Sequence, residues 1–222
     1  MARNFLFLVL LLAGVFALNM PARAGTDWEY WSHYEAIVPL SDDFTFKVKP
    51  EIRFKDNFSK LYYVHVEMGL DCKISDWFVL SPYYRHVDEI KVEKTKEVWK
   101  QEYRPQIDAT VKFKIHPFSF SDRNRIEFRV QDKENSVRFR YRNKATLGLP
   151  KFTKANIKPY VAAEPFYDFD TQRINKNRVY AGLDLDVIKH LKAGIYYILE
   201  SRKGKSGWTN VNVWGTSVKY IF

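Results

Sequence analysis

FTFKVKPEIRFK, residues 44–55, is the stretch that decides the fold class. From Phe44 to Phe54 every second residue is apolar, and the residues between them are polar, mostly charged. Successive side chains of a β-strand point to opposite faces, so this stretch predicts a strand with one apolar face and one ionic face. The charged residues of the ionic face are Lys47, Lys49, Glu51, Arg53 and Lys55.

The same period of two recurs along nearly the whole chain, and no helix of useful length is visible. Each alternating segment is longer than the roughly 5 to 6 residues of a typical globular strand, and suits the roughly 9 to 11 residues that cross a bilayer. We therefore predict an all-β fold, an antiparallel up-and-down transmembrane β-barrel of about 10–12 strands. The segments are 28–40, 44–55, 61–74, 77–88, 99–113, 119–131, 137–149, 157–169, 177–188, 191–203 and 208–222.

The number of segments conflicts with a general rule. Eleven segments alternate, whereas single-chain bacterial barrels have an even number of strands. Either the first segment is not a full strand, or one boundary is misplaced, so we expect an even number. The connections alternate between short ones, such as 75–76, and longer charged ones, such as 88–97. This alternation is typical of periplasmic turns and outer loops.

The N-terminus predicts a cleavable signal peptide over residues 1–24. Arg3 precedes an apolar run at 5–18, and Ala22-Arg23-Ala24 places small residues where a signal peptidase reads the chain. The apolar run is short for a membrane-spanning helix. We predict a single barrel domain over residues 25–222, exported to the bacterial outer membrane.

The composition excludes several classes of protein. Aromatic residues make up 17% of the chain, which is unlike a disordered protein. Cys72 is the single cysteine, so the chain has no internal disulfide. The formal charge is +10, and basic charge among aromatic residues also occurs in nucleic-acid-binding proteins. Export argues against a nucleic-acid partner, and no residue spacing predicts a metal or another cofactor.

Three features favour an apolar face that meets lipid. The chain ends in a phenylalanine, aromatic residues concentrate near the strand ends as in interfacial girdles, and a soluble barrel of this size would enclose a wide apolar space. The alternative is a soluble periplasmic, lipocalin-like carrier with its charges outside. The terminal residues resemble the signature recognised by the barrel assembly machinery: Val218, Tyr220 and Phe222.

With the apolar face outward, the lumen becomes crowded and basic. One interpretation is a lattice of ion pairs, because an unpaired buried charge is costly. The other is a narrow, anion-preferring, porin-like channel, since a cleft of one sign concentrates the opposite charge. The residues expected to face the lumen include the cations Arg53, Arg85, Arg104, Arg125, Arg129, Arg138, Arg140, Arg142 and Arg178, and the acids Glu51, Glu67, Glu102, Glu127, Glu164 and Asp184.

Several arginine-containing strand motifs together resemble one family. They resemble the domain of unknown function 2490 family of predicted bacterial outer-membrane β-barrels, over nearly all of the chain after the signal peptide. The resemblance implies location and architecture, and it carries no catalytic residue. The motifs include Pro50-Glu51-Ile52-Arg53-Phe54, Ser81-Pro82-Tyr83-Tyr84-Arg85, Glu102-Tyr103-Arg104-Pro105-Gln106, Asn124-Arg125-Ile126-Glu127-Phe128-Arg129, Arg140-Tyr141-Arg142-Asn143 and Asn177-Arg178-Val179-Tyr180-Ala181-Gly182.

Two histidines keep an enzymatic alternative open. His33 and His65 fall on polar faces, where Glu35 or Glu67 could orient them as general bases. The chain has no Gly-x-Ser-x-Gly motif, so we predict no catalytic residue. The alternatives are an outer-membrane hydrolase of lipid or peptide, and a structural barrel that supports the envelope without transport. The expected partners are outer-membrane lipid, lipopolysaccharide and the assembly machinery, and we expect a monomer.

Overall fold

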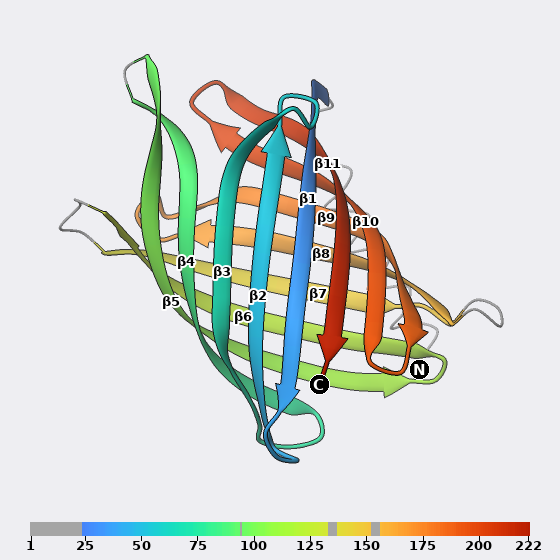
Figure 1. The fold of residues 1–222 in the computed structure, drawn as a ribbon. Helices are drawn as coiled ribbons and strands as arrows, with labels where there is room; N and C mark the ends of the chain where they lie inside the picture. Colours follow the sequence, from blue (N-terminus) through green and yellow to red (C-terminus); the bar gives the residue numbers. More distant parts are fainter. Residues whose placement is uncertain (1–23, 94, 133–136, 152–155) are drawn as a thin grey trace.

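The computed structural model describes residues 24–93, 95–132, 137–151 and 156–222, without the side chains of 24–27. Its strands form one closed barrel (Figure 1). The predicted signal peptide lies outside the described residues, apart from Ala24. The strands are β1 (Ala24–Pro39), β2 (Phe44–Lys55), β3 (Lys60–Lys73), β4 (Phe78–Glu93), β5 (Lys96–Ile115), β6 (Phe118–Gln131), β7 (Val137–Gly148), β8 (Ile157–Asp168), β9 (Arg173–Ile188), β10 (Leu191–Gly204) and β11 (Gly207–Ile221).

The barrel of the described residues has eleven strands, so the expected even number is wrong. Each strand pairs antiparallel with the next, as predicted. The exception is the closing pair of β1 and β11, which is parallel and aligns Trp31 with Gly215. An odd number of alternating strands leaves the first and the last pointing the same way. β1 is a full strand, because it pairs with β2 from Tyr30 to Pro39 as well.

The strand bounds define two ends of the barrel. We call the end where β11 finishes at Ile221 the C-terminal end, and the other the opposite end (Figure 1). The predicted loop 88–97 is wrong, because β4 and β5 continue through it to a two-residue connection. Charged residues stabilise this hairpin across the strands, as in the Glu93–Lys100 ion pair. The predicted difference in connection length between the two ends is therefore absent at this hairpin.

The two faces of the barrel differ in chemistry as the alternation predicts. Outward residues are apolar and exposed, including Ile195 and Trp214, which are 53% and 47% exposed. Inward residues are largely charged and buried, including Glu127 and Arg125, which are 0% and 1% exposed. This arrangement does not match the apolar interior of a lipocalin-like carrier.

The described residues contain no helix long and apolar enough to cross a membrane.

A polar cluster interrupts the apolar outer surface on β6 and β7. Asp122 accepts hydrogen bonds from the side-chain nitrogens of Asn124 at 2.9 Å and Asn143 at 2.7 Å. Tyr141 completes the cluster by donating to Asn124. The Asp122 carboxylate therefore has hydrogen-bond donors among its neighbours on the outer face, as a polar group away from water requires.

Candidate functional site

Paired charges fill the middle of the lumen. The alternation places them inside, and the cross-strand register brings opposite signs together, as in the Glu164–Arg178 and Glu127–Arg140 pairs. Because these groups are withdrawn from bulk water, they have to be paired. We call the following buried residues the ionic layer: Arg53, Arg85, Arg104, Arg125, Arg142, Arg178, Glu51, Glu67, Glu102, Glu127, Glu164 and Glu200.

Arg125 lies at the centre of the ionic layer. Its Nε and Nη2 donate to the two carboxylate oxygens of Asp108 at 2.6 and 2.7 Å, which is a bidentate pair. Its Nη1 lies 3.3 Å from Glu67. Glu67 also accepts hydrogen bonds from Lys49 at 3.1 Å and Gln106 at 2.7 Å, and it pairs with Arg85. Residues from four strands therefore meet at one carboxylate.

Glu164 is a second centre of the same layer. One of its oxygens accepts from Arg123 and from Arg142, each at 2.7 Å, and the other accepts from the Tyr180 hydroxyl. Arg142 also donates to Glu127 at 2.6 Å, which links this centre to the next carboxylate. Much of the ionic layer is therefore a connected network, in which Glu67, Glu127 and Glu164 each have more than one cationic partner.

Aromatic rings lie against the guanidiniums of the ionic layer, and two of them, Trp31 and Phe166, were not predicted from the sequence. The guanidinium carbons of Arg53 and Arg178 lie 3.7 and 4.6 Å from the ring centroid of Trp31, within cation–π range. Phe166 lies 4.5 Å from the guanidinium of Arg142 in the same way. The sequence does contain a signal for both rings. Trp31 lies two residues after Glu29 and Phe166 lies two residues after Glu164, so each shares the inward face of its strand with an acid.

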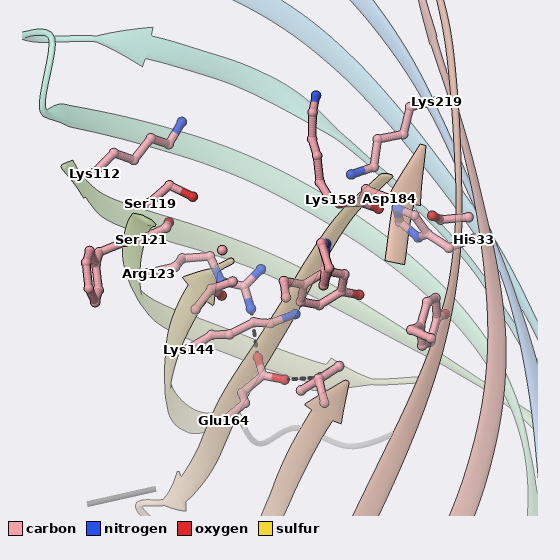
Figure 2. A pocket seen from close by; sticks show the side chains of 18 of the residues that line it. His33, Lys112, Ser119, Ser121, Arg123, Lys144, Lys158, Glu164, Asp184 and Lys219 are labelled. Atoms are coloured by element: carbon pink, nitrogen blue, oxygen red, sulfur yellow. Dashed lines mark hydrogen bonds and ion pairs between the residues drawn. The ribbon is translucent and has the colours of Figure 1, made fainter. Parts of the chain in front are cut away.

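A cavity of about 1570 Å³ lies between the ionic layer and the C-terminal end, and we call it the vestibule. Its wall runs from the connections of that end, such as His116-Pro117, to Arg125 and Arg178. Thirteen Lys and Arg residues line it against six Asp and Glu residues, an excess of seven positive charges. Figure 2 shows Lys112, Lys158 and Lys219 around this space, with Arg123, Lys144 and Glu164 together.

Part of the vestibule wall is aromatic. Tyr160, Gly182, Tyr196, Gly215 and Trp31 are successive cross-strand partners from β8 to β1. A Cβ on Gly182 would lie 2.5 Å from the Tyr160 ring, and one on Gly215 would lie 2.1 Å from the Tyr196 ring. Each tyrosine therefore lies flat over a neighbouring glycine, which only a residue without a side chain permits. We call these five residues the aromatic–glycine row.

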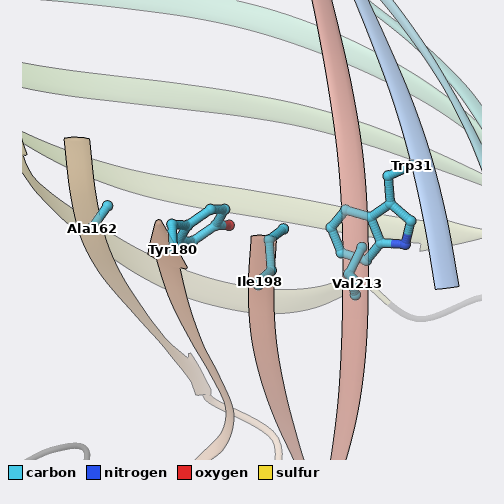
Figure 3. Packing of buried hydrophobic residues seen from close by; sticks show 5 residues of the cluster. All are labelled: Trp31, Ala162, Tyr180, Ile198 and Val213. Carbon is cyan, nitrogen blue, oxygen red and sulfur yellow. The ribbon is translucent and has the colours of Figure 1, made fainter. Parts of the chain in front are cut away.

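A buried apolar cluster continues this wall. Trp31 belongs to it, and Tyr160 and Tyr196 pack against it. Figure 3 shows the five members of the cluster on neighbouring strands of one side of the barrel. On this side of the lumen, apolar side chains therefore lie next to members of the ionic layer such as Arg178. The cluster consists of Trp31, Ala162, Tyr180, Ile198 and Val213.

Six of the nine arginines predicted to face the lumen lie in the ionic layer, and three lie elsewhere. Arg129 and Arg140 are half-buried beside it, bound to Glu102 and Glu127. Arg138 is exposed near the opposite end and lies 3.8 Å from Asp170. The five predicted glutamates belong to the ionic layer, whereas Asp184 lines the vestibule.

The two candidate histidines share one carboxylate. The Nδ1 atoms of His33 and His65 lie 3.5 and 3.7 Å from Glu51, so the expected partners Glu35 and Glu67 are wrong. Both distances exceed the roughly 3.2 Å at which a carboxylate orients a catalytic base. In the part of the chain that the structure describes, no group of three or more His, Cys, Asp or Glu side chains is placed to hold a metal ion.

The C-terminal residues face outward. Val218, Tyr220 and Phe222 are 37%, 44% and 68% exposed. The Phe222 amide donates to the Ile37 carbonyl of β1 at 2.9 Å, so the last residue is held at the closing pair.

The comparisons with known proteins place the chain in one family. The family described as protein of unknown function (DUF2490) matches residues 28–211. The chain belongs to this family. The match begins in β1 and ends in β11, so it includes every residue of the ionic layer. A search of curated proteins found no match.

Proposed function

We propose that this DUF2490 protein is an outer-membrane β-barrel that admits small anionic solutes into its vestibule and conducts them slowly. The outward apolar face, the buried charges and the long strands support a membrane location. The outward Val218, Tyr220 and Phe222 support insertion through the C-terminal strand. The hairpin of β4 and β5 extends beyond the rest of the opposite end (Figure 1). We assign that end to the outer side, because β4 and β5 project there and barrels of this kind carry their larger extensions on the extracellular side.

The charge of the vestibule carries the proposal. An excess of seven cations in a narrow space of low dielectric raises the local concentration of anions and excludes cations. Beyond the vestibule, the ionic layer narrows the path. Barrels of about eight strands are filled by side chains, and those of about sixteen leave an open channel. We therefore expect a small conductance with a preference for anions.

Current recordings test this function. The barrel is purified, refolded in detergent and inserted into a planar bilayer under a KCl gradient. It should give small current steps, with a reversal potential shifted toward the equilibrium potential of chloride. Charge reversal at the vestibule, Lys112→Glu with Lys219→Glu, should weaken or invert this preference. Lys189→Glu with Lys203→Glu is the matched control, because neither residue lines the vestibule. A cation-selective reversal potential would overturn the proposal.

The connected ionic layer favours a second candidate, a closed barrel that supports the envelope without transport. The same recordings separate the two functions. Correctly inserted protein without any conductance would refute transport and support the structural function. Deletion in the source bacterium should then weaken the envelope without changing its permeability to small anions.

A further inference from the structure

Two cations at the inner part of the vestibule face each other without full compensation. Arg123 on β6 and Lys144 on β7 are direct cross-strand partners, and like charges in this position repel. The Arg123 Nη2 is 2.7 Å from Glu164. Among the described residues, no carboxylate lies within 4.0 Å of the Lys144 Nζ, which instead lies 3.9 Å from the ring centroid of Tyr180. Glu164 therefore contacts Arg123 but not Lys144, and it is already shared with Arg142 and Arg178.

Arg123 also holds an unused donor. Its Nε is buried and has no hydrogen-bond partner in the described part of the chain. The nearest carboxylate oxygen, from Asp108, is 4.0 Å away. A buried donor without a partner costs roughly 1 to 3 kcal/mol. An incoming oxygen that accepts from this group would remove that cost.

The approach to this pair is lined by hydroxyl groups. Ser119 and Ser121 on β6 and Thr146 on β7 line the vestibule between its mouth and the pair. The described inward residues of these two strands on this side carry no carboxylate. Figure 2 shows Ser119, Ser121 and Arg123 in sequence along the strand, with Lys144 beside them. Hydroxyls donate to an anion without repelling it.

The aromatic–glycine row and the apolar cluster together supply a different surface in the same cavity. Tyr160, Tyr180 and Tyr196 all line the vestibule, together with Ile198. Lys144 meets this surface directly at the Tyr180 ring. Ligand sites typically combine apolar and aromatic walls with a few polar groups that fix orientation, and this junction has both parts.

We propose that Arg123 and Lys144 bind an organic oxyanion, a phosphate or carboxylate group attached to a flat apolar body. The oxyanion lies at the two cations, and the body lies against the tyrosines of the vestibule. This inference rests on the proposed function, because it names the class of solute that the same lumen selects.

Titration calorimetry on the refolded barrel in detergent at low salt tests the site. The probes are phenyl phosphate, benzoate, inorganic phosphate and benzyl alcohol. An aromatic oxyanion should bind about tenfold more tightly than inorganic phosphate or benzyl alcohol. The comparison of phenyl phosphate with benzoate identifies which oxyanion the pair prefers.

Lys144→Met is the decisive variant, because among the described residues Lys144 forms no direct ion pair, and its Nζ lies over the Tyr180 ring instead. It should weaken phenyl phosphate or benzoate binding about tenfold or more. Lys189→Met, an exposed site outside the vestibule, is the control and should leave binding unchanged.

The aromatic surface is tested separately. Tyr160→Leu should reduce binding of the aromatic oxyanions toward that of inorganic phosphate, and Tyr160→Phe, which keeps a ring over Gly182, should preserve it. Equal binding by wild type and Lys144→Met, or equal affinity for phenyl phosphate and inorganic phosphate, would overturn the inference. Anion preference in bilayers depends on all thirteen cations, so it should persist in Lys144→Met. Loss of that preference in the wild type with binding intact would overturn the proposed function instead.

Discussion

The two sides of the lumen are filled by different kinds of side chain. On β2 to β7, long charged side chains fill the space, and each must find a partner of opposite sign. On β8 to β11 and β1, the ionic layer continues through Glu164, Arg178 and Glu200, but toward the C-terminal end tyrosine rings lie over glycines, and the fit there is one of shape. Packing by charge pairs should therefore lose stability when a charge is removed, and packing by shape should lose stability when an atom is added. A solute with an anionic group and an apolar body matches the line where the two sides meet.

We expect the largest loss of stability from removing a charge in the ionic layer. Arg125→Ala strands the carboxylate of Asp108 and takes one partner from Glu67, so we expect a loss of about 3 to 5 kcal/mol in the free energy of unfolding. Urea titration of the refolded barrel measures it, with the shift between folded and unfolded bands on a gel as readout. The double variant Arg125→Ala with Asp108→Ala removes both charges and should recover part of the loss. A single variant as stable as wild type would show that water, not pairing, satisfies these charges.

A smaller effect breaks the shape-based side. Gly215→Ala places a Cβ 2.1 Å from the Tyr196 ring, so one of them must move, at a cost of about 1 to 3 kcal/mol. The same urea titration measures it. Combining Gly215→Ala with Tyr196→Ala should remove the clash. The loss of stability in the double variant should therefore be smaller than the sum of the losses in the two single variants. Strictly additive losses would contradict the proposed contact.

Tyr180→Phe sharpens the comparison where the two sides touch. The change keeps the ring and removes the hydroxyl that donates to Glu164. Glu164 retains Arg123 and Arg142, so we expect a loss of about 1 kcal/mol in the unfolding titration. The matched change Tyr84→Phe, on the exposed outer face, should have no effect. Equal losses in the two variants would argue against a specific bond to Glu164.

We expect the smallest effect at an exposed ion pair, which serves as a reference for the buried pairs. Lys73 and Asp76 form an ion pair at the C-terminal end, where both side chains are solvated. Lys73→Ala should leave the urea midpoint unchanged within error, because exposed pairs contribute little. A measurable loss would mean that charge pairing matters on this barrel even in water, and it would weaken the contrast drawn above.

The period of two was sufficient to predict the strands and their faces. Every predicted segment overlaps a strand of the structure, because a membrane-type strand repeats one simple alternation over its whole length. The region 88–97 was mistaken for a loop because its residues are charged. Cross-strand pairing, as between Glu93 and Lys100, offsets their weak preference for strands. The polar Asp122 cluster was also missed, because the alternation assigns that face to apolar residues.

The site was harder to predict than the faces. Alternation shows that Arg125 and Glu67 both point inward, but they are 58 residues apart, and their contact depends on strand tilt and register across the barrel. The same holds for the vestibule, which gathers residues from strands that are distant in sequence. That no acid of the described residues lies within 4.0 Å of the Lys144 Nζ is a property of the packed lumen, so no local sequence pattern predicts it.

The parallel closure of β1 and β11 restricts how this chain can be rearranged. Ala24 and Phe222 lie at opposite ends of the barrel, so a circular permutant would need a linker that runs roughly 50 Å along the wall. In a barrel with an even number of strands, a short turn would be enough. Duplicating or deleting a hairpin changes the strand number by two and keeps it odd. Only the gain or loss of a lone strand at the closing pair would convert this architecture into an even-numbered one.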